Sequence, residues 1–166
     1  MNEYFDRIRN QYRCSSGDST SLFKDLTDIA EQIGFGEALA LLETCVVEKR
    51  LAWVQENYSQ DEQQKITAHD GYYWFYERYL GVSTPKDGEI IEQTDNRIVS
   101  RWWNPCPTLE ACQQLGLDTR QVCKLAYHKP VDIFLKQIHP QLQFNRNYSC
   151  IRPHAEYCEE IIEFIA

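Results

Sequence analysis

The sequence lacks the features that mark several large classes of protein. It has no run of lysine and arginine, and its formal net charge is −8 at pH 7, whereas binding to nucleic-acid phosphates needs a concentrated basic surface. No segment approaches the ~18 consecutive apolar residues that span a bilayer. The charged N-terminal stretch MNEYFDRIRNQY contains no apolar core of a signal peptide. We therefore expect a cytoplasmic protein that binds neither nucleic acid nor membranes.

Internal repeats, low-complexity segments and linkers are also absent from the sequence. The length of 166 residues and a hydrophobic content of 43% suit one domain with a real core. We expect a single domain over residues 1–166, divided into a helical N-terminal part at 1–81 and a cysteine-rich α+β part at 86–166.

The N-terminal part carries apolar residues at helical spacing. Phe5, Ile8 and Tyr12 follow a period near 3.6, and Leu22 to Ile33 form one apolar stripe that stops at Gly34. A turn is expected at Ser15–Ser19 between these two segments. The expected helices cover residues 2–13, 22–33, 36–58 and 60–80.

The C-terminal part combines strands with short helices. Two β-runs at 89–93 and 97–103 flank a Thr-Asp-Asn turn, and residues 142–149 alternate apolar and polar side chains. Helices are expected after Cys106, after Asp118, and over 130–140, and a last amphipathic helix after Pro153. The predicted fold is α+β and mostly helical, with a small antiparallel sheet (hairpin 89–103 plus strand 142–149) packed against helices.

Cys106 stands between two prolines at the start of an expected helix. Proline suits the first helical position, so Pro107 makes Cys106 the predicted N-cap residue. Unsatisfied N–H groups and the helix dipole stabilise negative charge there, and the thiolate is the reactive form of cysteine. The alternative is that Cys106 is a small buried residue at a strand-to-helix corner.

The seven cysteines are an odd number, and a chain without a secretory signal is not expected to build a disulfide framework. No C-x-x-C pair is present, so the spacing predicts no structural zinc site and we expect no cofactor. An alternative is a zinc or iron site assembled in space. Its ligands would be Cys106, Cys123, His154 and Cys158.

A nucleophilic thiol needs a base, and His69 is the first candidate because helical spacing places it on one face with Ile66 and Tyr76. Arg101, Arg146 or Arg152 could hold a substrate carboxylate, although ion pairing with the abundant glutamates is the competing interpretation. Asn104 could donate to a polarised carbonyl or make a turn before proline. The substrate-binding candidates are Arg101, Trp102, Asn104, Arg146 and Tyr73 of the aromatic run GYYWFYERYL.

Four segments together resemble a known family. NPCP at 104–107, LEAC, GLDTRQVC at 116–123 and RNYSCIRPHAEYCEEII at 146–162 are similar to the L-2-amino-thiazoline-4-carboxylic acid hydrolase-like family over roughly the last 80 residues. Cys106 and Cys123 match its two cysteine positions. The resemblance implies hydrolytic opening of a cyclic amidine-like ring that bears a carboxylate, with Cys106, Cys123 and His69 as the catalytic candidates.

Two other functions remain open at this stage. Domains of the vinyl-reductase type carry a similar cysteine arrangement, so a non-catalytic small-molecule-binding domain is one alternative, and a metal-binding protein is the other. For the hydrolase and for the small-molecule-binding domain, the expected partner is a small molecule. The aromatic helix and the acidic surface would also tolerate a homodimer.

Overall fold

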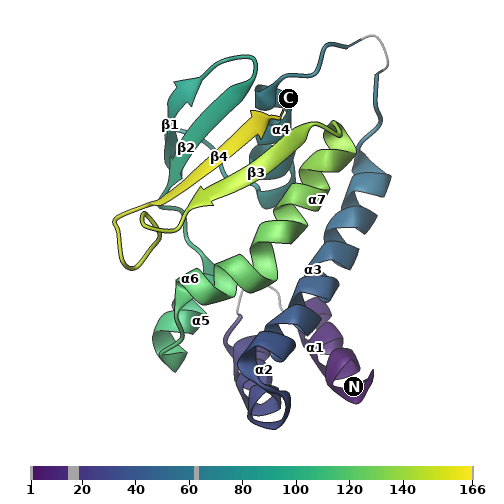
Figure 1. Ribbon diagram of the computed structural model, residues 1–166, viewed down its shortest axis with the longest axis vertical. Helices are drawn as coiled ribbons and strands as arrows, with labels where there is room; N and C mark the ends of the chain where they lie inside the picture. The colour runs from purple at the N-terminus through teal and green to yellow at the C-terminus, as the bar shows by residue number, and fades with distance from the viewer. Residues whose placement is uncertain (1, 15–18, 62–63, 166) are drawn as a thin grey trace. The chain divides into compact units, whose positions relative to one another are not determined.

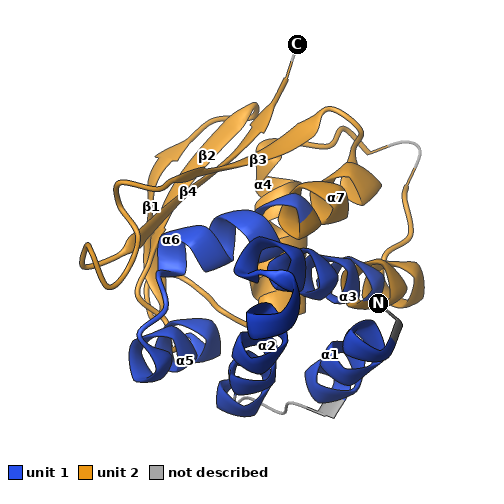
Figure 2. Ribbon diagram, turned by 60° about the horizontal axis from the view of Figure 1, so that its bottom comes forward, with its two compact units in different colours: residues 1–48, 106–129 blue, residues 49–105, 130–166 orange. Residues whose placement is uncertain are grey.

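The computed structural model describes residues 2–14, 19–61 and 64–165, and the chain divides into two compact units (Figure 2). Unit 1 contains residues 1–48 and 106–129, and unit 2 contains residues 49–105 and 130–166. Each unit has a hydrophobic core built from its own residues. Most of the turn expected at Ser15–Ser19 lies outside the described residues.

Unit 1 is helical among its described residues. Helix α2 packs against both α1 and α5, and Gly34 ends α2 with a φ of 92°, where glycine has no steric penalty. Its core gathers apolar side chains such as Phe23, Leu39 and Ala111, which are fully buried. The elements are α1 (Asn2–Cys14), α2 (Thr20–Ile33), most of α3 (Phe35–Asn57), α5 (Pro107–Leu115), α6 (Thr119–Val122) and the π-helix η2 (Cys123–Tyr127).

Unit 2 packs helices on an antiparallel sheet with the strand order β1-β2-β4-β3 (Figure 1). Helix α4 (Ala68–Tyr72), which continues as the π-helix η1 (Tyr73–Leu80), lies against β2 and β4. Gly71 allows this close approach, because an added Cβ would stand 3.2–3.3 Å from Leu135, Leu142 and Ile162. The remaining elements are β1 (Gly88–Gln93), β2 (Arg97–Trp102), α7 (His128–Ile138), β3 (Leu142–Asn147) and β4 (Cys158–Phe164).

The α+β fold class and the hairpin are confirmed, but the expected last helix is wrong. Residues 158–164 form strand β4, which pairs with β2 on one side and β3 on the other. The apolar spacing of Tyr157, Ile161 and Phe164 is compatible with a helical stripe. In the strand, however, Glu160 and Ile162 are the buried residues, as the two-residue period of a strand requires.

Two helix boundaries also differ from expectation. The helix expected over 60–80 begins at Ala68, where Thr67 and Asp70 form a capping box. The helices expected after Asp118 and over 130–140 form one continuous segment from Thr119 to Ile138. The wide π-turn of η2 ends at Tyr127, three residues before Pro130, a residue that has no N–H to donate to a helical partner.

The described helices include none that is both long enough and apolar enough to cross a membrane.

Strand β4 gives a test of the fold at two neighbouring isoleucines. We expect Ile162→Ala to lower the free energy of unfolding by ~2–5 kcal/mol, since Ile162 is 1% exposed in the core. Ile161 faces the opposite side of the strand and is half-buried, so Ile161→Ala should cost about half of that or less. Urea unfolding of the two variants measures the difference, and equal losses would contradict the strand.

Candidate functional site

The backbone places Cys106 where the sequence predicts it, at the N-cap of α5. Its φ and ψ of −129° and 107° are extended, Pro107 opens the helix, and the Cys106 carbonyl accepts the Glu110 N–H at 3.1 Å. The Cys106 side chain is half-buried and makes no capping hydrogen bond. A thiol in this position lies beside the positive end of the helix dipole.

Cys112, one turn and a half further along α5, interacts electrostatically with two other cysteines of unit 1, Cys106 and Cys123. Its side chain is fully buried, and burial raises the pKa of its thiol to about 12, with the negative charges of Cys123 and Cys106 as further causes. The two cysteines that match the family pattern therefore both influence the ionisation of Cys112. Cys112 itself stays protonated at neutral pH and is excluded as a nucleophile.

The N-terminus of α5 is tied to the end of η2 by a hydroxyl pair. Thr108 Oγ1 donates to Tyr127 Oη at 3.4 Å. His128 follows Tyr127, and its backbone N–H bonds to the Cys123 carbonyl, so His128 stands one π-turn after Cys123. His128 is the one histidine of the four that belongs to unit 1. The sequence offers no signal for this pairing, because π-turns follow no simple residue period.

His69, by contrast, does not share a helix face with the buried Tyr76, although its spacing in the sequence predicts this. It is exposed in the first turn of α4, and its ring stacks on Tyr72 with 5.6 Å between centroids. The buried face of α4 and η1 is formed by Ala68, Tyr72 and Tyr76, so a start at Ala68 leaves His69 one residue round the helix from that face. His69 belongs to unit 2, and Cys106 and Cys123 belong to unit 1.

A buried polar network occupies the centre of unit 2. Tyr76 Oη donates to Glu160 Oε2 at 2.5 Å, and Arg146 donates to Glu160 Oε1 from Nε at 3.0 Å and Nη2 at 2.5 Å. Ser100 Oγ accepts the Trp102 indole N–H at 2.9 Å. Burial raises the pKa of Tyr76 well above its usual value, and the charge of Glu160 adds to this effect.

Two of the substrate-binding candidates therefore lie in this interior. Trp102 is 3% exposed and stacks on Tyr76 at 4.4 Å. The Arg146 guanidinium is committed to Glu160 in a buried ion pair. A substrate carboxylate could reach Arg146 only by displacing Glu160.

The other candidates serve local structure. Arg101 pairs with Glu159 at 2.9 Å and covers the Tyr157 ring at 4.5 Å, which agrees with the ion-pair interpretation. A hydrogen bond from Asn147, and after it the hydrogen bond and charge of Arg101, hold the pKa of Glu159 below its usual value. The Asn104 amide donates to the Pro105 carbonyl at 3.0 Å.

The last two candidates, Arg152 and Tyr73, also have structural surroundings of their own. Arg152 Nη1 donates to the Asn104 carbonyl at 2.8 Å, which fastens the loop before β4 to the end of β2. Tyr73 is 38% exposed and meets Trp74 edge to face.

The alternative metal set is divided between the units. His154 is exposed in the turns before β4 and Cys158 begins that strand, so the two do not lie on the helix that was expected after Pro153. Cys106 and Cys123 lie in unit 1. Across residues 2–14, 19–61 and 64–165, no group of three or more His, Cys, Asp or Glu side chains gathers as a metal site.

An open hollow of about 880 Å³ lies on unit 1, and its lining contains none of the predicted site residues. It is lined by Glu3, Asp6, Arg7, Asn10, Gln11 and Asp25.

No family model, curated protein or solved structure matches this chain.

The Cys112 thiol predicts a loss of stability at alkaline pH. Its pKa is about 12 in the folded protein and near 9 when unfolded, so its contribution is complete below about pH 9. That contribution is lost as pH rises from 9 toward 12, because the unfolded chain then releases a proton that the folded chain keeps. Denaturant midpoints between pH 7 and 10.5 should fall less steeply for Cys112→Ala than for the wild type. Parallel slopes would contradict the assignment.

Proposed function

We propose that this chain is a thiol-dependent hydrolase that opens a cyclic carbon–nitrogen bond of a small carboxylate substrate, with Cys106 as its nucleophile. The resemblance to the L-2-amino-thiazoline-4-carboxylic acid hydrolase-like family is the source of the substrate class. The observation that carries the proposal is the position of Cys106 at the N-cap of α5, and the electrostatic influence of Cys106 and Cys123 on the buried Cys112 supports it.

The chemistry follows from which thiol can ionise. Cys112 is held in the protonated form by burial, so the nucleophilic thiolate falls to Cys106, which has the helix dipole beside it. Cys123, at the start of η2, would support the site from the facing helix.

The reaction divides into two steps. The thiolate attacks the amidine-like ring carbon and forms a C–S bond, and the ring C–N bond breaks with its electron pair and a proton passing to nitrogen. Water then adds to the same carbon, and the bond between that carbon and the Cys106 sulfur breaks. The oxygen stays on the product, and a proton from the water restores the Cys106 thiol. We assign the proton transfers to His128, the histidine of the same unit, one π-turn from Cys123.

A substitution series tests the nucleophile. With 2-amino-thiazoline-4-carboxylate as substrate, Cys106→Ser should lower kcat by about 10²-fold or more, because a neutral hydroxyl is a far weaker nucleophile than a thiolate. Iodoacetamide should label Cys106 faster than Cys112, with mass spectrometry locating the label. Cys150→Ser, which changes a half-buried thiol of unit 2, is the matched control and should keep full activity.

Full activity in Cys106→Ser would contradict the proposal. Wild-type protein that binds the ring without opening it would favour instead the non-catalytic small-molecule-binding domain.

A further inference from the structure

Arg50 is a buried cation that the proposed reaction does not use. It lies on the part of α3 that belongs to unit 2 and is 7% exposed. A guanidinium keeps its charge at any physiological pH, and buried charges in proteins are nearly always paired. No carboxylate of the described residues forms an ion pair with Arg50.

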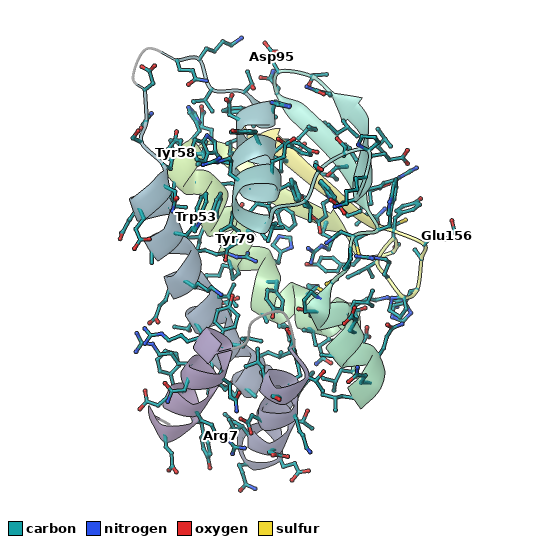
Figure 3. The ribbon with its side chains drawn as sticks, turned by 180° about the vertical axis from the view of Figure 1, so that it is seen from behind. Arg7, Trp53, Tyr58, Tyr79, Asp95 and Glu156 are labelled. Carbon is teal, nitrogen blue, oxygen red and sulfur yellow. The ribbon has the colours of Figure 1, made fainter. Side chains whose placement is uncertain are left out.

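The surroundings of Arg50 are aromatic instead of acidic. Its guanidinium carbon stands 5.2 Å from the centre of the Phe75 ring and 5.7 Å from that of Tyr79. Trp53, one turn further along α3, meets Tyr79 at 5.3 Å and Phe134 at 5.9 Å, and Figure 3 shows Trp53 and Tyr79 as neighbours. Phe75 and Tyr79 are both on η1, and π-helical turns are frequent at functional sites.

The hydrogen-bonding edge of the guanidinium is what remains unsatisfied. An aromatic ring attracts a cation through its π-electrons but offers no lone pair to a guanidinium N–H. The buried Nε and Nη1 atoms have no hydrogen-bond partner among the described residues, whereas Nη2 is not fully enclosed. Nη1 and Nη2 form the end-on fork of the group, which matches the two oxygens of a carboxylate or phosphate.

We propose that Arg50 is the anchor of an oxyanion-binding site in unit 2, which takes the carboxylate or phosphate group of a small organic molecule. The anion approaches Nη2, the terminal nitrogen that is not fully enclosed, and neutralises the buried charge, while the rings of Phe75 and Tyr79 lie against the guanidinium. This site is independent of the chemistry at Cys106.

Arg101 and Arg146 contrast with Arg50. Glu159 and Glu160 already neutralise them. Of these three buried or half-buried guanidiniums in unit 2, Arg50 is the one for which a ligand would supply the missing charge.

Ligand-dependent thermal stability tests the site, with inorganic phosphate and benzoate as probes and sodium chloride at equal ionic strength as the blank. Each oxyanion that binds should raise the Tm of the wild type beyond the blank. Arg50→Met should lose this rise, with at least about tenfold weaker binding by calorimetry. Arg78→Met is the matched control, since Arg78 is an exposed guanidinium 5.8 Å from the Trp74 ring, and it should keep the rise.

Comparison of the two probes identifies the oxyanion: a stronger effect of benzoate indicates an aromatic carboxylate, and a stronger effect of phosphate indicates a phosphate ester. No rise in the wild type, or an equal rise in Arg50→Met, would overturn the proposal. If Arg50→Met does not fold, Arg50→Lys keeps the charge without the planar fork and should bind both probes more weakly. Unchanged binding in that variant would also overturn the proposal.

Discussion

Unit 2 depends on one carboxylate that must be paired. Glu160 lies on the buried face of β4, the strand between β2 and β3. Burial of an unpaired charge costs several kcal/mol, and Glu160 avoids that cost because Arg146 and Tyr76 both donate to it. The pairing fixes the sheet register, since Ser100, Glu160 and Arg146 form one transverse row. A slip of one residue would move Glu160 to the opposite face and leave Arg146 without its partner.

The same network accounts for the position of the aromatic helix. Tyr76 lies on η1, so its hydroxyl joins the helix to the sheet, and its ring stacks on Trp102 of β2. The face of the sheet that the network covers is therefore closed by aromatic side chains. In unit 1 a hydrogen bond between two hydroxyl groups has a similar role. Thr108, in the first turn of α5, and Tyr127, at the end of η2, join these two helices next to Cys106 in the chain. We propose that reactivity belongs to that unit and oxyanion binding to the other.

Local signals in the sequence predicted the features that depend on neighbouring residues. Proline at 107 and glycine at 116 mark the two ends of α5, and the Thr-Asp-Asn turn marks the hairpin. Strand β4 could not be predicted in this way, because Ile161 and Ile162 fit a helix stripe and only pairing with distant strands selects the extended form.

The candidate site follows the same division between local and distant effects. The N-cap position of Cys106 was predictable from Pro107. His69 is exposed because of where α4 begins. Arg146 forms its ion pair with a glutamate 14 residues away in the chain, Glu160, so neither outcome follows from neighbouring residues. Arg50 gave no signal at all, since a single arginine in an apolar helix resembles any surface residue until its neighbours are known.

A double-mutant cycle between Tyr76→Phe and Arg146→Met tests the central claim, that both side chains stabilise unit 2 through the single carboxylate of Glu160. Urea unfolding of the wild type, the two single variants and the double variant gives the coupling energy. We predict a coupling of about 1 kcal/mol or more, because residues that share one buried partner do not act independently. Losses that add to within about 0.3 kcal/mol would contradict the claim.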